Sequence, residues 1–211
     1  MPTVDTYPDS AIKLDLKVPA VVTADTAEAG KDITDYKGKC MVVAAITKNS
    51  GTATTADVAI QACNDSDIIG TIGYAGTGNG TITEVEGGPD AVAEDITVTF
   101  SNGTTAAVVG SVSGSLGSAT VGTKFVHAKI SFMLTAGSVA FVNLDAFTVT
   151  VTAARTYTTV LSFTQVVATN IIEKKTLNID SIGRFIRAYT DVSATGTPNY
   201  TVGVSLYGLK N

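Results

Sequence analysis

His127 is the only histidine in the sequence, and this limits the catalytic chemistry that the chain can perform. A serine or cysteine nucleophile that relies on histidine as its base would have to use it, and no Gly-x-Ser-x-Gly elbow accompanies it. One histidine and two cysteines also fall short of the four ligands of a cysteine–histidine zinc site. We therefore expect His127 to be an ordinary packed or exposed side chain.

Two glycine-rich stretches come close to nucleotide-binding motifs without matching them. Residues 117–124 read GSATVGTK, in which threonine precedes lysine, so the lysine is displaced from the position that reaches the phosphates. The residues that follow alternate like a strand, whereas a phosphate-binding loop leads into the N-terminus of a helix. Residues 76–81 read GTGNGT, lack the third glycine of the dinucleotide fingerprint, and are predicted to form a turn.

Acidic residues cluster at 65–67 (DSD) and at 84–86 (EVE), and such oxygen ligands suit calcium. Neither cluster is followed by a bidentate glutamate at the spacing of a calcium loop, so we interpret both as solvated turn carboxylates. Paired carboxylates for glycoside cleavage remain an open alternative, although the chain has no tryptophan on which a sugar could stack. The sequence thus predicts no catalytic, cofactor-binding or metal-binding residue, and we expect a protein that is not an enzyme.

The elements that would position these residues are short β-strands. Within residues 70–152, apolar side chains alternate with threonine over several residues, a period of two that is typical of half-buried strands. The clearest cases are Ile96, Val98 and Phe100; Ile130, Phe132 and Leu134; and Phe147, Val149 and Val151. No stretch of this block shows a persuasive helical pattern.

Local signals also predict two hairpins. Asn102-Gly103 follows an alternating stretch, and this pair tolerates positive φ at both central positions of a tight turn. A second hairpin is expected between residues 185–191 and 200–207, around the turn-forming stretch 193–198.

Residues 11–18 predict a strand with one face exposed to solvent. Four apolar residues alternate there with Lys13, Asp15 and Lys17. Pro19 is expected to end the strand, because proline cannot donate a hydrogen bond to a neighbouring strand.

Composition and charge exclude several classes of partner. Charged residues make up 16% of the chain, against roughly 25% in ordinary domains, and 45% is hydrophobic. The low share of charged residues has two equally good explanations: strands that pack on both faces, or strands that pack against another subunit. The net charge of −5 leaves no basic footprint for nucleic acid, and no apolar run is long enough to span a membrane. The first ten residues do not resemble a secretion signal, so we expect a cytoplasmic origin.

Cys40 and Cys63 are the only cysteines, and both lie in apolar stretches. In a reducing cytosol we expect two buried thiols. A disulfide between neighbouring strands is the alternative.

Glycine density and charge change near residues 70 and 152, which suggests two domains. We expect an all-β protein. Residues 1–69 and 153–211 would form a discontinuous β-sandwich, of jelly-roll or immunoglobulin-like type, and residues 70–152 an inserted glycine-rich β domain.

Two parts of the chain resemble virion proteins of tailed bacteriophages. The central block is similar to a small β module of phage head decoration proteins, through residues 78–81 (GNGT), 117–125 (GSATVGTKF) and 132–151 (FMLTAGSVAFVNLDAFTVTV). That last segment usually carries a Gly-Asp pair, and here Leu144 replaces the glycine before Asp145. The flanks resemble a β-sandwich of capsid-associated proteins, through residues 57–67 (DVAIQACNDSD) and 184–208 (RFIRAYTDVSATGTPNYTVGVSLYG).

The resemblance implies a capsid decoration, or cement, protein that binds the major capsid protein on the virion surface and stabilises the shell. It also implies self-association, commonly as a homotrimer, with no nucleic-acid or membrane partner. We expect residues 1–10 and exposed sheet edges to make the contacts, because an unpaired edge can accept a strand from a partner. A tail or head-fibre protein that contacts the host surface is the first alternative. A carbohydrate-binding or adhesive β-sandwich is the second.

Overall fold

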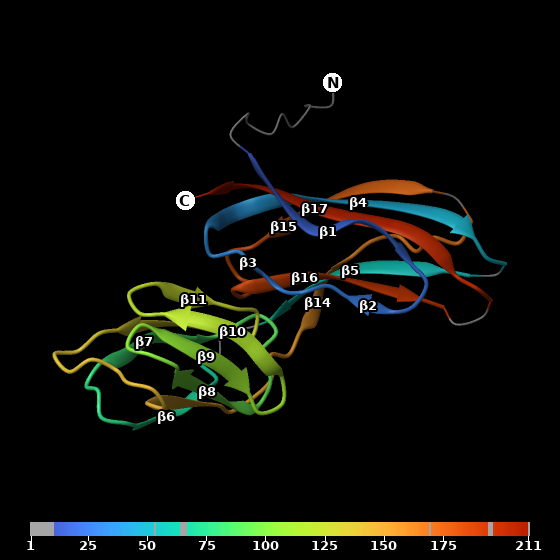
Figure 1. Cartoon of the computed structure of the whole chain (residues 1–211). Coiled ribbons are helices and arrows are strands. Elements are labelled where there is room, and N and C mark those ends of the chain that lie inside the picture. The colour runs from blue at the N-terminus through green and yellow to red at the C-terminus, as the bar shows by residue number, and fades with distance from the viewer. Residues whose placement is uncertain (1–10, 53, 64–66, 169, 194–195, 211) are drawn as a thin grey trace. The chain divides into compact units, whose positions relative to one another are not determined.

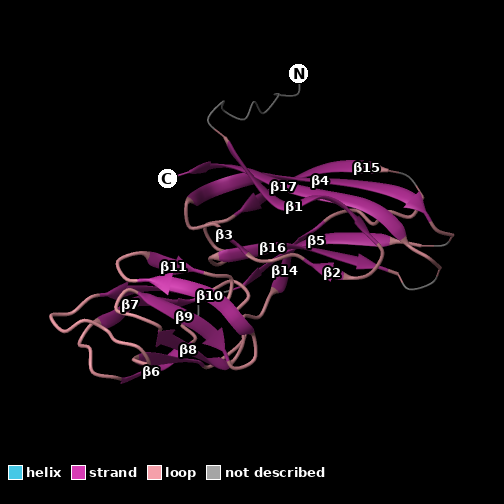
Figure 2. Cartoon of the chain, in the orientation of Figure 1, coloured by secondary structure: helices cyan, strands magenta, loops and turns pink. Residues whose placement is uncertain are grey.

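The computed structural model describes residues 11–52, 54–63, 67–168, 170–193 and 196–210, and this part of the chain contains strands and no helix (Figure 2). All of its strand pairs are antiparallel. The expectation of an all-β protein is therefore confirmed. Residues 1–10, which were expected to form a contact arm, lie outside the described residues.

The chain divides into two compact units. Unit 1 consists of Met1–Asp65 and Thr156–Asn211, and unit 2 consists of Ser66–Arg155 (green to orange-yellow in Figure 1). The boundaries expected at residues 70 and 152 lie a few residues inside unit 2.

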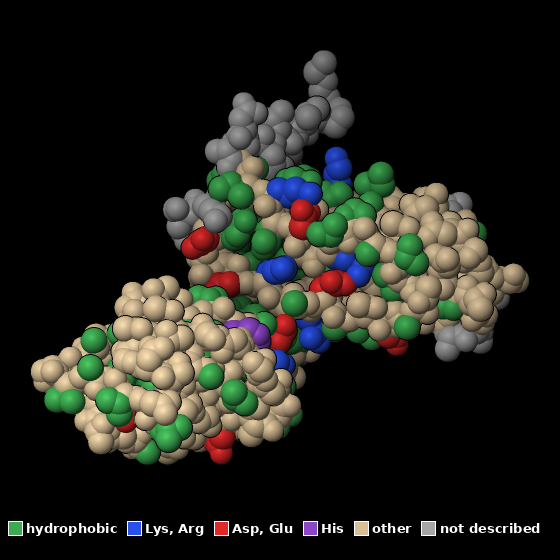
Figure 3. Space-filling view, in the orientation of Figure 1, with side chains coloured by type: hydrophobic (Ala, Val, Ile, Leu, Met, Phe, Trp, Pro, Cys, Tyr) green, Lys and Arg blue, Asp and Glu red, His purple; other side chains and the backbone are tan. Residues whose placement is uncertain are grey.

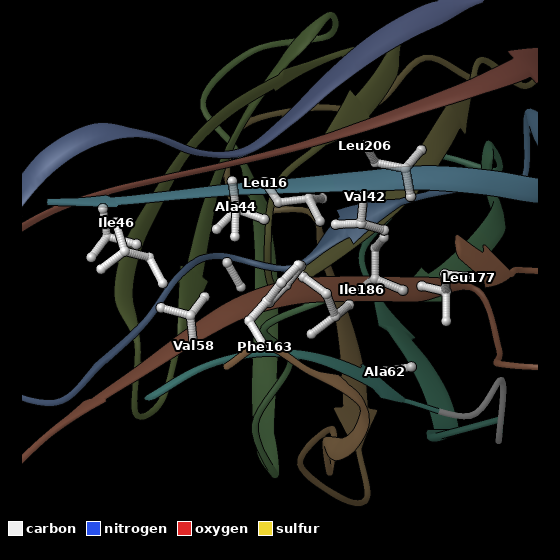
Figure 4. Packing of buried hydrophobic residues seen from close by; sticks show 14 of the residues in the cluster. Leu16, Val42, Ala44, Ile46, Val58, Ala62, Phe163, Leu177, Ile186 and Leu206 are labelled. Carbon is white, nitrogen blue, oxygen red and sulfur yellow. The ribbon is translucent and has the colours of Figure 1, made fainter. Parts of the chain in front are cut away.

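Unit 1 is built from two facing sheets. Its strands are β1 (Ile12–Val22), β2 (Thr26–Ala27), β3 (Lys31–Asp32), β4 (Tyr36–Ser50), β5 (Ala56–Cys63), β14 (Thr158–Ser162), β15 (Ile171–Asn178), β16 (Phe185–Val192) and β17 (Asn199–Lys210). One sheet has the order β1-β17-β4-β15, and the other has the order β14-β5-β16-β2, with β3 also paired to β16. In Figure 4, Val42 and Ile46 of β4 point toward the layer that contains Val58 and Ile186.

Unit 2 is a second antiparallel sandwich with its own core. Its strands are β6 (Ile69–Ala75), β7 (Thr81–Gly87), β8 (Glu94–Phe100), β9 (Thr105–Gly110), β10 (Gly114–Thr120), β11 (Lys124–Val126), β12 (Ile130–Thr135) and β13 (Ala146–Val151). A five-stranded sheet, β10-β9-β8-β13-β6, accompanies a three-stranded sheet, β11-β12-β7. The apolar positions of the three alternating stretches predicted from the sequence are all buried in this core, which confirms those strands and their faces.

The insertion of unit 2 begins and ends at adjacent strands of unit 1. β5 is the last strand before unit 2 and β14 is the first strand after it. These two strands pair directly, with Thr158 opposite Ala62. The chain therefore leaves and re-enters unit 1 at neighbouring positions of a single sheet.

Strand β1 differs from its prediction in two ways. It continues past Pro19 to Val22, and two register shifts against β17 flank Lys17. Because a bulge adds one residue and reverses the alternation, Lys17 points inward, is 6% exposed and forms an ion pair with Glu28. β1 is an edge strand, so a proline, which has no N–H, can stand there without breaking a hydrogen bond to a neighbouring strand.

The hairpin predicted from β16 to β17 is wrong. β16 pairs with β5 in one sheet, whereas β17 pairs with β1 and β4 in the other. The chain therefore crosses from one sheet to the other between Val192 and Asn199.

The hairpin predicted at Asn102-Gly103 is confirmed, but its mechanism differs. β8 and β9 flank residues 101–104, and neither Asn102 nor Gly103 has a positive φ. Asn102 instead accepts hydrogen bonds at its Oδ1 from the backbone N–H groups of Thr104 and Thr105, each over 2.9 Å. The turn is thus held by the asparagine side chain.

Cys40 lies in β4 and Cys63 ends β5, in different sheets of unit 1. Both thiols are buried and they are not joined in a disulfide, which confirms the first interpretation of the pair. Burial raises the pKa of the Cys40 thiol, and the charge of Asp180 adds to the effect.

Candidate interaction surface

His127 has an ordinary structural environment. It follows β11, and its Nδ1 accepts a hydrogen bond from the backbone N–H of Lys129 over 3.2 Å. Its ring lies nearly parallel to that of Phe125, with centroids 6.3 Å apart.

The other chemical candidates from the sequence serve turns and strand contacts. Glu84 and Glu86 lie within β7, so their interpretation as turn carboxylates is wrong. Lys124, the last residue of the loop that resembles a phosphate-binding motif, forms a 2.9 Å ion pair with Glu84 across the three-stranded sheet. Asp67 accepts a hydrogen bond from the N–H of Ile69 over 3.0 Å; Asp65 and Ser66 lie outside the described residues. Within the described residues, no three histidine, cysteine or acidic side chains come together as metal ligands. The same part of the chain contains no helix that is long and apolar enough to cross a membrane.

Two carboxylates lie close to Asp191 of β16. Asp57 of β5 lies directly opposite Asp191, and Asp25 accepts a hydrogen bond from the N–H of Val192 over 2.9 Å. Burial and the negative charge of Asp25 raise the pKa of Asp191 above its usual value. A raised carboxyl pKa means that the charged form is disfavoured in the folded state.

Asp191→Asn is therefore expected to increase the free energy of unfolding at pH 7, by on the order of 0.5 kcal/mol for an interaction among solvent-exposed charges. Because the folded pKa is raised, the gain should shrink as the pH falls through it and vanish below the usual aspartate pKa. Urea unfolding between pH 4 and 8 measures this. Asp180→Asn is the control with the same charge change: Asp180 accepts the N–H of Gly38 over 2.7 Å, an amide oxygen can accept the same bond, and that variant should gain no stability. A gain at Asp191→Asn that grows in acid would contradict the argument.

One loop of unit 2, residues 136–145, is held from inside by two buried side chains. Asp145 is 3% exposed. Its Oδ1 accepts the N–H of Thr77, and its Oδ2 accepts the N–H groups of Gly78 and Val142, each over 3.0 Å. These bonds, that of Thr77 foremost, lower the pKa of Asp145.

Phe141 is the second anchor. Its ring is 2% exposed and stacks on Phe100 with a centroid separation of 3.9 Å. Asn79, from the glycine-rich turn 76–80, fixes the outer part of the loop, because its Oδ1 accepts the N–H of Val139 over 2.8 Å. The loop and the turn are thereby tied together.

Next to these anchors the loop presents apolar side chains to solvent. Val139, Val142 and Leu144 are 51%, 48% and 73% exposed. Tyr74 of β6, which is 39% exposed, contacts the two anchors of the loop, since its ring lies 6.3 Å from that of Phe141 and its hydroxyl donates a hydrogen bond to Asp145. We call these four residues the apolar end of unit 2. Figure 3 shows few charged side chains and scattered hydrophobic ones on the visible face of unit 2.

The apolar end is also uncharged. Residues 68–80 contain no charged side chain, and residues 136–149 contain only Asp145, which is buried. Single exposed apolar residues are common, but an uncharged group of them is typical of a surface that another molecule covers.

Leu144 adopts a backbone conformation that favours glycine. Its φ is +74°, in the left-handed region that costs a leucine roughly 1–2 kcal/mol. The turn before Asp145 is therefore strained at Leu144.

Leu144→Gly should therefore raise the free energy of unfolding by about 0.5–1 kcal/mol, since glycine adopts positive φ freely but loses more chain entropy. Urea unfolding measures the change. Asn143→Gly, one residue earlier and without positive φ, should give no gain. Equal effects at both positions would argue against strain at Leu144.

Sequence reasoning did not find this surface. The isolation of Asp145 in an otherwise uncharged stretch was the available signal. Sheet edges were expected as contact elements, but the sequence did not indicate which edge.

No family model and no curated protein matches the chain. Two crystal forms of FlgL from Xanthomonas campestris share 16% identity with it over 48% of this chain, with a TM-score of 0.34. The chain covers 33% and 32% of the two FlgL chains, about a third of their length. So weak a likeness assigns neither a family nor a function.

Proposed function

We propose that the chain is a non-enzymatic structural protein of a tailed bacteriophage that decorates the capsid and stabilises the shell by binding neighbouring capsid subunits. The observation that carries the proposal is the apolar end of unit 2, which is exposed, uncharged and anchored from inside by Asp145 and Phe141. The centre of a protein interface is depleted in charge and rich in apolar side chains, and such a surface on a rigid loop loses little entropy on binding.

Cementing requires only differential binding. A protein that binds the assembled shell and not the separated subunits stabilises assembly in proportion to the logarithm of its concentration over its Kd. The proposed partner is the major capsid protein, and the proposed location is the outer surface of the virion after synthesis in the host cytoplasm. The homotrimer implied by the resemblance remains a prediction.

Counting copies per purified virion by quantitative mass spectrometry tests the proposal. A copy number comparable to that of the major capsid protein is expected for decoration. A low copy number would instead favour the tail or head-fibre alternative, and absence from the particle would refute a virion role.

The double variant Val139→Lys/Leu144→Lys is expected to bind the assembled capsid shell at least tenfold more weakly than wild type. Two ammonium groups would have to lose their water in the contact. Co-sedimentation with shells stripped of this protein measures the affinity. Val126→Lys/Ile172→Lys makes the same charge change at residues that are 74% and 75% exposed elsewhere, and should bind normally. Equal loss in both variants would show that charge alone matters and not the apolar end.

A further inference from the structure

Strand β6 has one side on which no strand lies. It is the last strand of the five-stranded sheet and, within the described residues, pairs only with β13. All residues from 70 to 75 are exposed. One register shift falls between the pairs Val149–Ile72 and Val151–Ile69, so residues 72–75 form the regular part of this edge.

The other edge strands of the described structure carry features that discourage pairing with another chain. β1 has a proline, an inward-pointing lysine and two bulges; β15 and β7 carry charged residues; β11 is short and carries a lysine; and β2 and β3 are only two residues long. β10 and β14 each have a bulge in the middle of the strand, whereas the register shift of β6 precedes Ile72. The residues concerned are Lys17 and Pro19 in β1, Glu173, Lys174 and Lys175 in β15, Glu84 and Glu86 in β7, Lys124 in β11, Gly117 in β10 and Val160 in β14. The regular part of β6 has no such feature.

Both faces of this edge suit a strand partner. Ile72 and Tyr74 share the face of Val149 and Phe147, the core side of the sheet, yet stay 45% and 39% exposed at the edge. On the other face, a Cβ at Gly73 would meet no atom within 4 Å.

We propose that β6 pairs antiparallel with β6 of a second copy of this chain, about a two-fold axis through Gly73. Residues that face each other across a continuous sheet must lie on the same side of it, which places such an axis on a residue. Ile72 then lies opposite the partner's Tyr74, and Tyr74 opposite the partner's Ile72. Aromatic and β-branched side chains are favourable cross-strand neighbours, and the two glycines meet at the axis without a clash.

The absence of charge along β6 is compatible with a second copy of the chain as its partner. No charged side chain lies between residues 68 and 80, so the pairing brings no like charges face to face. The rest of unit 2 has seven acidic and three basic residues, so the repulsion between two copies is long-range and screened by salt. The contact is short and belongs to the class of weak interfaces. We expect the dimer to form at about 100 µM chain, and its dissociation constant should fall as the salt concentration is raised.

Sedimentation equilibrium of the full chain between about 10 µM and 1 mM tests this inference. The wild-type chain should approach twice the mass of one chain, and Gly73→Lys should stay monomeric because two ammonium groups would meet at the axis. Ile172→Lys, on β15 of unit 1, makes the same charge change and should dimerise as wild type. Circular dichroism checks that Gly73→Lys folds, as the open space at its Cβ leads us to expect.

A covalent variant gives a second readout. Residues facing each other across antiparallel strands have Cα atoms about 4.5–5.5 Å apart, within the range for a disulfide. Gly73→Cys should therefore oxidise to a linked dimer at least tenfold faster than Val126→Cys, whose residue is exposed on β11. Equal rates, a monomer at every concentration, a trimer, or a dimer that survives Gly73→Lys would each overturn the inference. It does not depend on the decoration proposal. It predicts a dimer of the free chain where the resemblance implies a homotrimer, so sedimentation of the purified chain decides between the two.

Discussion

Replacing Phe141 with alanine should destabilise unit 2 by about 3–5 kcal/mol, the usual cost of truncating a buried phenylalanine. The ring is buried, stacks on Phe100 and meets Phe147 edge-on at 5.9 Å, so its removal leaves a cavity and breaks an aromatic cluster. Unit 1 has a separate core and should stay folded.

Two probes distinguish the units. Hydrogen exchange should speed up in peptides from residues 66–155 of the Phe141→Ala variant. The thiol of Cys40, which is buried in unit 1, should still resist alkylation. Phe125→Ala, which removes a ring that is only half buried, should have a smaller effect. Rapid alkylation of Cys40 in the Phe141 variant would mean that the units unfold together.

Asp145→Asn should open the loop that carries the apolar end, although it changes only one atom. Both carboxylate oxygens accept backbone N–H groups, so an amide nitrogen at either position places a donor against a donor. An N–H left without an acceptor costs about 1–3 kcal/mol, which corresponds to roughly tenfold to hundredfold faster exchange at Thr77, Gly78 or Val142. Residue-resolved hydrogen exchange measures this.

Glu94→Gln is the matched control for Asp145→Asn. Glu94 is also a buried carboxylate, and its Oε2 accepts the N–H groups of Val112 and Ser113. Its Oε1, however, faces the hydroxyl of Ser113 over 2.7 Å, and a hydroxyl can turn to accept from an amide. This variant should therefore remain close to wild type. Equal disruption in both variants would show that the negative charge matters and not the pattern of donors.

The pH response of Asp145 should have the opposite sign to that of Asp191. The pKa of Asp145 is lowered in the folded state, so its contribution to stability is complete above the usual aspartate pKa and is lost as the pH falls through the folded value. The two carboxyl groups thus act against each other in acid, one in each unit.

Much of the fold could be predicted because alternation of apolar residues determines which face of a strand is buried. Ile96, Val98 and Phe100 show this, since each is buried as expected. Lys17 shows the limit. Whether a bulge turns it inward depends on β17, which lies nearly two hundred residues away in the sequence and cannot be identified from the local pattern.

Strand pairing failed for the same reason. A short connection can turn back to a neighbour or cross to the facing sheet, and the residues between Val192 and Asn199 suit either path. The candidate surface could not be predicted from the local pattern either. Val142 and Leu144 resemble ordinary strand or loop residues, and their exposure follows from the burial of Phe141 and Asp145 on either side of them.

The pairing of β5 with β14 makes unit 2, in topological terms, an enlarged hairpin loop. Because closing a long loop costs little more entropy than closing a short one, the sandwich of unit 1 is compatible with connections of very different size at this point. A turn of a few residues between Ala62 and Thr158 would preserve the same sheet. Unit 1 can thus serve as a constant platform, while the inserted module is exchanged, lost or gained during evolution without any redesign of the platform's core.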